Sequence, residues 1–239
     1  SVLGYSENLF YTDNNITLLK KNVSGSIFGK RVYTDGYGFR VPKLDYEYNS
    51  NSKKTLLLGD SVSFGVGVNE EDTFIGLWRN NTNDNLLNAS VSGHNSSSYS
   101  KLLEDYSIKF PNLSKILIFI CLNDIISYEG VIDKTNLNDI QKTKNFSFIQ
   151  NLKSNIFFIK LNLFLRNKSA LYVFLKSVLS NPPQRYFEEV YPLYSNKKLV
   201  TNLQKNFLKI KKLVEINDLN LQIIILPYSY QVEEANCNS

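Results

Sequence analysis

Three short polar segments contain the side chains of this sequence that could do chemistry. They span residues 59–61, 92–95 and 122–124, and each directly follows an apolar run. The first segment ends in Ser61, which a glycine and an aspartate precede. A serine at a sharp strand-to-helix turn projects its hydroxyl over the edge of a sheet, with backbone N–H groups beside it. This pattern predicts that Ser61 is a catalytic nucleophile for acyl transfer.

The other two segments supply groups that could stabilise the negative charge created by such an attack. Gly93 has no side chain, so its N–H can approach a substrate oxygen closely. Asn123 can donate an amide N–H to an oxyanion, whereas a carboxylate would repel it. Together with the N–H of Ser61, these groups predict an oxyanion hole of three donors, each worth about 2.7–4 kcal/mol in the transition state.

Five neighbouring residues are predicted to support or line this site. Gly59 permits the tight turn, and Asp60 positions it, because a carboxylate beside the nucleophile cannot itself bind an oxyanion. Asp124 supports the third segment, while His94 and Asn95 are candidates to line the site. Each feature alone also has an ordinary structural interpretation as a turn or a helix cap. Their occurrence at successive strand ends favours a functional site.

Strands that alternate with helices are required to position these segments. Short apolar runs predict buried strands at residues 55–58, 85–91, 115–121 and 221–226. Helical spacing predicts helices at residues 72–80, 97–110 and about 199–214. The alternation predicts an α/β fold, in the form of a three-layer α/β/α flavodoxin-like sandwich with a central parallel sheet. Ligands bind such sheets at the carboxyl ends of the strands, where the polar segments lie.

The remaining parts of the chain predict the domain organisation. Residues 1–52 form an irregular N-terminal arm that packs on the core, because turn-forming residues fill its most distinct part. Residues 53–239 form the main domain. Within it, residues from about 125 to 195 are predicted to be an inserted helical cap, because this stretch has helical spacing and is too long for a simple loop.

Composition excludes several classes of function. The net charge of +5 is mild and the lysines are scattered, so we expect no nucleic-acid partner. One histidine and two cysteines are too few for a His/Cys zinc site, and we expect neither a metal nor a cofactor. The Gly65-Val66-Gly67 segment lacks the third glycine of a dinucleotide-binding fingerprint, which makes a nucleotide-binding function the least favoured alternative.

The polar segments also resemble the sequence blocks of a known family. Residues 57–68 (LLGDSVSFGVGV) closely resemble block I of the SGNH (GDSL-like) hydrolases, which include many bacterial members. Residues 88–93 (NASVSG) and 121–124 (CLND) resemble blocks II and III, with Gly93 and Asn123 at the oxyanion positions. Residues 38–40 (GFR) and 227–231 (PYSYQ) are similar to elements that flank these blocks. The resemblance implies an esterase, lipase, thioesterase or carbohydrate deacetylase with Ser61 as nucleophile.

Two departures from the family pattern concern packing and the catalytic base. Cys121 stands where block III normally opens with glycine. The final Asp-x-x-His block, which supplies the base, does not occur in the 239 residues. The single histidine, His94, adjoins an oxyanion donor and is badly placed for a base. We therefore expect the Asp-x-x-His block to lie beyond Ser239, and an inactive relative is the alternative.

The sequence thus predicts a serine-dependent hydrolase of a carbohydrate or lipid-like acyl or acetyl ester. An O-acyltransferase acting on a glycan with the same site, and an inactive binding module of the same fold, remain alternatives. The expected partner is a small acylated substrate. The chain contains no methionine, so removal of an N-terminal targeting or anchoring segment is compatible with the sequence, and membrane association stays open.

Overall fold

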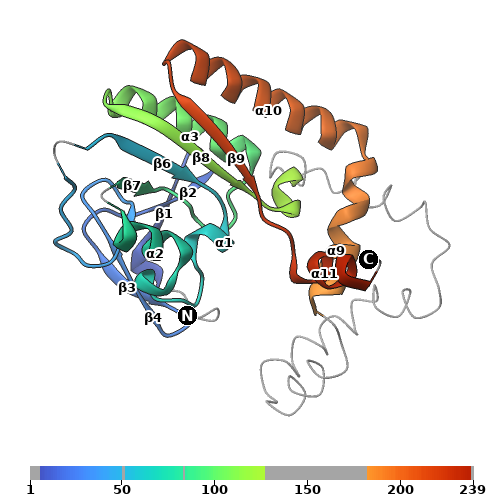
Figure 1. Cartoon of the computed structure of the whole chain (residues 1–239), viewed down its shortest axis with the longest axis horizontal. Helices are drawn as coiled ribbons and strands as arrows, with labels where there is room; N and C mark the ends of the chain where they lie inside the picture. The colour runs from blue at the N-terminus through green and yellow to red at the C-terminus, as the bar shows by residue number, and fades with distance from the viewer. Residues whose placement is uncertain (1–5, 50–51, 83, 127–181, 238–239) are drawn as a thin grey trace. The chain divides into compact units, whose positions relative to one another are not determined.

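The computed structural model describes residues 6–49, 52–82, 84–126 and 182–237 (Figure 1). The chain divides into two compact units. The first consists of Ser1–Ser127 with Asn196–Pro227, and the second of Tyr128–Ser195 with Tyr228–Ser239. All three polar segments belong to the first unit, so this unit contains the candidate site.

A seven-stranded mixed sheet with the order β3-β4-β5-β7-β6-β8-β9 forms the centre of the first unit. Strands β7, β6, β8 and β9 pair in parallel, and they comprise Asn85–Asn88, Lys54–Leu58, Leu113–Ile120 and Asn220–Ile225. By their succession along the chain these four strands have the order 2-1-3-4, which is that of flavodoxin-like sheets. The prediction of an α/β fold is confirmed, but the sheet is mixed and not wholly parallel.

Alternate side chains of the parallel strands build two separate cores. Leu56, Leu58, Leu87, Ile116 and Ile118 belong to a cluster that also contains residues of α3 (Ser96–Lys109) and α10 (Lys197–Ile216). The intervening strand residues belong to a second cluster and are Leu57, Leu86, Leu117 and Phe119. This second cluster also contains Ile75 and Trp78 of α2 (Phe74–Asn81). Because successive side chains of a strand point to opposite faces, helices cover both faces of the sheet.

Side-chain caps define where the helices begin. Thr73 accepts a hydrogen bond from the N–H of Gly76, which fixes the start of α2. Asn95 accepts from Ser97 N and Ser98 N at the start of α3, and Asn196 caps α10 in the same way. The four-residue helix α1 (Ser61–Phe64) is capped by Asp60, whose carboxylate accepts from Val62 N. The starts that helical spacing predicts, at residues 72, 97 and about 199, lie within two residues of those observed.

The prediction that the N-terminal arm is irregular was wrong. The arm forms two hairpins, β1 (Phe10–Asp13) with β2 (Ile16–Leu19) and β3 (Ser24–Ile27) with β4 (Lys30–Thr34). Each has a two-residue loop in which both residues have positive φ, as type I′ turns require; the loops are Asn14-Asn15 and Phe28-Gly29. The short strand β5 (Arg40–Val41) then pairs with β4 and β7, so the arm extends the central sheet.

The described part of the second unit is helical and aromatic. It contains α9 (Pro182–Val190), η4 (Tyr191–Ser195) and α11 (Ser229–Cys237). The ring of Phe187 lies 5.2 Å from that of Tyr191 and 5.4 Å from that of Tyr230. Most of the predicted helical cap, residues 127–181, lies outside the described residues, so the cap stays a prediction. Among the described helices, none is long and apolar enough to cross a membrane.

Candidate active site

Ser61 is the first residue of α1, directly after β6 (Figure 1). Its side chain is half-buried, and Asp60 before it is buried. The carboxylate of Asp60 accepts the N–H of Val62 at 2.9 Å, which caps the helix and fixes the turn that carries the serine. The structure therefore places Ser61 at the strand-to-helix turn that was predicted for it.

The tightness of this turn explains why a glycine precedes Asp60. A Cβ atom added to Gly59 would lie 2.0 Å from Ser63 Oγ and 3.2 Å from Phe119 Cβ. Ser63 is fully buried, and its hydroxyl donates to the backbone carbonyl of Asp60 at 3.3 Å. The space that a side chain at position 59 would need is thus already filled by the first turn of α1 and by β8.

The second polar segment forms a turn after β7. The N–H of His94 donates to the carbonyl of Val91 at 3.1 Å, and Gly93 inside this turn has a φ of 90°. L-residues with side chains rarely adopt such an angle, so the turn favours glycine. Gly93 is exposed, and the N–H of Val91 donates to the carbonyl of Gly59 at 3.2 Å. This last bond ties the turn after β7 to the turn after β6.

The third polar segment is the short helix η3 (Leu122–Ile125), directly after β8. The amide of Asn123 donates from Nδ2 to Asp60 Oδ2 at 3.2 Å. The thiol of Cys121 lies 3.5 Å from Asp60 Oδ1 and donates to it. The structure therefore brings the first and third predicted segments together through the side chain of Asp60. They meet at the carboxyl ends of β6 and β8, where the chain order of the strands reverses, as at the switch point of a flavodoxin-like sheet.

Asp124, the last residue of the third polar segment, is fully buried. Its Oδ2 accepts from the backbone N–H of Cys121 and from the hydroxyl of Tyr99, each at 3.0 Å. Its Oδ1 is buried and has no hydrogen-bond partner among the described residues. The pKa of Asp124 is raised from 3.8 to about 8, because burial, and to a smaller extent the charge of Asp60, outweigh the two hydrogen bonds, which lower it. The neutral acid is therefore the favoured form near pH 7.

His94 is buried and engaged with the N-terminal arm. Its Nε2 lies 2.7 Å from the carbonyl of Thr17 in β2, so this nitrogen carries the proton that is donated. The other ring nitrogen, Nδ1, is buried and has no partner among the described residues. Burial lowers the pKa of His94 to about 4, although the contact with Thr17 and the charge of Asp60 raise it. His94 is consequently a neutral imidazole at pH 7.

The other candidate lining residue, Asn95, has a structural role. Its side chain accepts the N–H groups of Ser97 and Ser98 at 3.0 and 3.3 Å and caps α3. Asn95 is only 3% exposed, which leaves little of it to touch a ligand. Across the described ranges, no three His, Cys, Asp or Glu side chains are grouped as a metal site would require.

Two residues that contribute to this region are not predicted from the sequence. Tyr99 of α3 belongs to the apolar core, and its hydroxyl contacts Asp124. Cys121, which stands where block III normally opens with glycine, contacts Asp60 through its thiol and Asp124 through its N–H. The phenol of a tyrosine on an otherwise apolar helix face is the one signal that could have indicated such a contact.

Comparisons with known proteins give little guidance. No protein-family model matches the sequence, and no curated protein matches it. Among solved structures, the chain is similar to a member of the lipolytic protein G-D-S-L family from Veillonella parvula DSM 2008. The TM-score is 0.28 at 12% identity, over 78% of this chain and 84% of that chain. A similarity this weak carries no argument about activity, so function has to be inferred from the residues of the chain itself.

Proposed function

We propose that the chain is a serine-dependent ester hydrolase that acts through an acyl-enzyme at Ser61. The observation that carries this proposal is the hydrogen bond between Asn123 and Asp60, since it holds an amide donor beside the turn of the proposed nucleophile. The backbone bond from Val91 to Gly59 supports it, because it holds the turn with Gly93 against the same strand end. Three strand ends then contribute to one site.

In the proposed reaction, the Ser61 oxygen attacks the ester carbonyl carbon and a base takes the hydroxyl proton. The carbonyl oxygen becomes an oxyanion, which accepts hydrogen bonds from Ser61 N–H, Gly93 N–H and the Asn123 amide. The oxyanion then reforms the carbonyl as the C–O bond to the alcohol breaks. The base gives its proton to the departing alcohol, and the acyl group stays on the serine. The Asn123 amide has two N–H bonds, and Nδ2 donates to Asp60 Oδ2 at 3.2 Å, which orients the amide beside the Ser61 turn.

The proposed substrate is an acyl or acetyl ester of a carbohydrate or of a lipid-like molecule. In hydrolysis, water attacks the acyl-enzyme and releases the acid. In the alternative acyl transfer, a glycan hydroxyl replaces the water and receives the acyl group. Both reactions use the same residues, so incubation with an acyl donor, with and without a glycan acceptor, separates them by their products.

A second candidate function is that of a binding module without catalysis. The environment of His94 favours it, because a buried imidazole that donates to the carbonyl of Thr17 is not directed at a serine hydroxyl through that nitrogen. A serine requires a partner that accepts its proton. Among the described residues, no hydrogen-bond partner of Ser61 Oγ fulfils this requirement. This candidate predicts that a ligand binds but is not turned over.

The deciding experiment is covalent labelling with a fluorophosphonate, followed by mass spectrometry of the peptides. The hydrolase proposal predicts a single adduct on Ser61, none in Ser61→Ala, and parallel loss of hydrolysis of a small ester. Ser97→Ala is the matched control, because Ser97 is also a half-buried serine in the first turn of a helix. Equal labelling of the Ser61→Ala protein refutes the proposal, and absence of labelling in the unsubstituted full-length protein favours the binding module.

A further inference from the structure

Arg40 has an environment that is unusual for a charged side chain. It is 0% exposed and is the largest of the fully buried side chains. No carboxylate forms an ion pair with it in the part of the chain that the structure describes. Burial lowers the pKa of Arg40 to about 10, so the guanidinium keeps its charge at pH 7. Burial of a charge is costly unless other groups compensate it.

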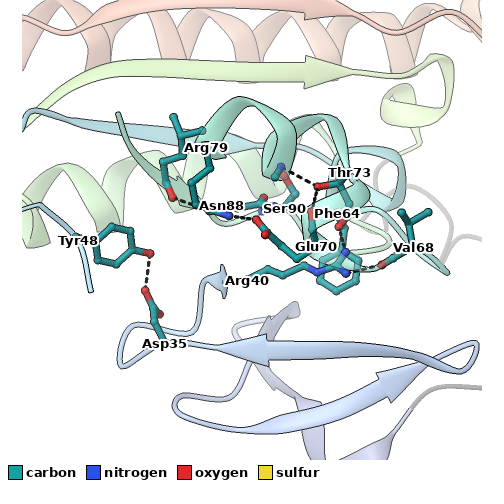
Figure 2. Close-up of polar contacts among 12 residues, drawn as sticks. Asp35, Arg40, Tyr48, Phe64, Val68, Glu70, Thr73, Arg79, Asn88 and Ser90 are labelled. Carbon is teal, nitrogen blue, oxygen red and sulfur yellow. Dashed lines mark hydrogen bonds and ion pairs between the residues drawn. The ribbon is translucent and has the colours of Figure 1, made fainter. Parts of the chain in front are cut away.

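Backbone carbonyls of the segment that follows Ser61 provide this compensation (Figure 2). Arg40 Nη1 donates to the carbonyl of Phe64 and, at 2.9 Å, to that of Gly65. Its Nη2 donates to the carbonyl of Val68 at 2.6 Å. The guanidinium also lies over the ring of Phe64, 4.7 Å from its centroid. One side chain thus binds three carbonyls within five residues.

These carbonyls belong to the segment that holds the backbone of Ser61. The carbonyl of Ser61 accepts the N–H of Gly65 at 3.1 Å and the N–H of Val66 at 3.2 Å. Gly65 has a φ of 81°, and a Cβ there would lie 3.0 Å from Arg40 Nη1 and 2.4 Å from Thr73 Cγ2. The turn therefore passes close to the guanidinium, and Thr73 leaves no room for a side chain at position 65.

Arg40 itself is anchored in the central sheet. Arg40 lies in β5 and is paired with Asn88 of β7. Strand β7 is in turn paired with β6, the strand that precedes Ser61. The sheet thus fixes the arginine, the arginine fixes the carbonyls, and the adjacent N–H groups fix Ser61. We propose that Arg40 is a positioning residue that holds the Ser61 turn in one conformation, a role that rests on the proposed function of Ser61 as nucleophile.

The charge alone does not fulfil this role. A guanidinium is a planar fork that can bind several acceptors at once, whereas a lysine ammonium is a point charge on a flexible stem. Arg40→Lys therefore retains the charge but loses the simultaneous contact with three carbonyls, and Arg40→Met loses both. A displacement of about 1 Å at a reacting group can lower a rate by about 10²-fold. We expect slower acylation of Ser61 in both variants, by about this factor in Arg40→Met.

The test measures the rate of fluorophosphonate labelling of Ser61 and the hydrogen exchange of the Gly65 and Val66 amides. Arg79→Met is the matched control, since Arg79 is a buried arginine that pairs with Glu70 and does not bind the Ser61 turn. The expected result is slow labelling and fast exchange at these two amides in Arg40→Met alone. In Arg40→Ala, whose short side chain leaves space for a cation, recovery of the labelling rate with millimolar guanidinium, but not with methylammonium, distinguishes positioning from a general loss of stability.

Each outcome decides the proposal. A folded Arg40→Met protein that labels and exchanges like the unsubstituted protein overturns it. If Arg40→Met does not fold, Arg40→Lys provides the same comparison. If even the unsubstituted protein is not labelled, the proposed hydrolase function fails, while the exchange rates still decide whether Arg40 holds the turn. Equal exchange at Gly65 and Val66 in the Arg40 and Arg79 variants would then overturn the positioning role.

Discussion

The side chains of Asp60 and Asn123 form a hydrogen bond of 3.2 Å that joins the turn after β6 to the turn after β8. The same carboxylate caps α1 through the N–H of Val62. One residue therefore determines both where the first turn of α1 begins and how the Asn123 amide is oriented. Substitutions at the two positions should consequently influence each other.

The first prediction concerns this coupling. Asn123→Ala should lower the rate of Ser61 acylation by about 10²–10³-fold, because one proposed oxyanion donor is lost. Asp60→Ala should lower stability by about 0.5–2 kcal/mol through loss of the cap, and should also slow acylation by releasing Asn123. The double variant should be less impaired than the product of the single effects, since both remove the same interaction.

Labelling rates of the two single variants and of the double variant measure this coupling. If the loss of labelling rate in the double variant equals the product of the losses in the two single variants, Asp60 does not act through Asn123. Thermal unfolding of the same proteins separates the effect on the helix cap from the effect on the site.

The second prediction concerns the glycine that precedes Asp60. Gly59→Ala should destabilise the protein by about 1–3 kcal/mol, because the added Cβ overlaps with Ser63 Oγ in a filled space. A second substitution, Ser63→Ala, should recover part of this loss by removing that oxygen. Gly36→Ala is the control, since a Cβ there meets only Asn22, at 3.6 Å. A lower free energy of unfolding in urea for Gly36→Ala than for Gly59→Ala would contradict the packing argument.

The core strands and helices could be predicted because apolar periodicity and capping residues determine them locally. The run from Ile116 to Phe119 is buried at every position, as expected of a strand that is covered on both faces. The hairpins of the N-terminal arm were missed although their turns carry a signal. An Asn-Asn pair adopts positive φ more readily than most residues do, so the pair Asn14-Asn15 is a signal for the first hairpin.

The contacts beneath the site could not be predicted from local pattern. His94 meets the carbonyl of Thr17 across 77 positions, and Tyr99 meets Asp124 across 25. Such contacts depend on how β2 and η3 pack around the sheet, which neither spacing nor residue type indicates. The approach of Asn123 to Asp60 was easier to anticipate, because parallel strands bring their carboxyl ends to one edge of the sheet.

The third prediction is a loss of stability as the pH rises, caused by Asp124. Its pKa is raised from 3.8 in the unfolded chain to about 8 in the folded protein, so the folded state retains a proton that the unfolded state has released. The contribution of Asp124 to stability is fully present below the unfolded-state pKa of 3.8 and is lost as the pH rises to the folded-state pKa of about 8. The slope for one proton is about 1.4 kcal/mol per pH unit.

Urea unfolding between about pH 6.5 and about pH 8 should show this decline in the unsubstituted protein and a smaller one in Asp124→Asn. Tyr99→Phe provides a second test. The hydroxyl of Tyr99 lowers the pKa of folded Asp124, so its removal should extend the decline to higher pH. Identical pH profiles for the unsubstituted protein and Asp124→Asn would rule out a titration of this carboxyl.

The last prediction has the opposite sign and concerns His94. Its pKa falls from 6.5 in the unfolded chain to about 4 in the folded protein, so the unfolded state binds the additional proton. The contribution of His94 is present above pH 6.5 and is lost as the pH falls toward 4. In this window the slopes of His94 and Asp124 oppose each other, at about 1.4 kcal/mol per pH unit each. In His94→Gln, stability should therefore fall as the pH rises from about 4 to about 6.5, relative to the unsubstituted protein. A variant with an unchanged profile in this window would show that the imidazole is not held neutral by burial, and a base function of His94 would then deserve direct measurement.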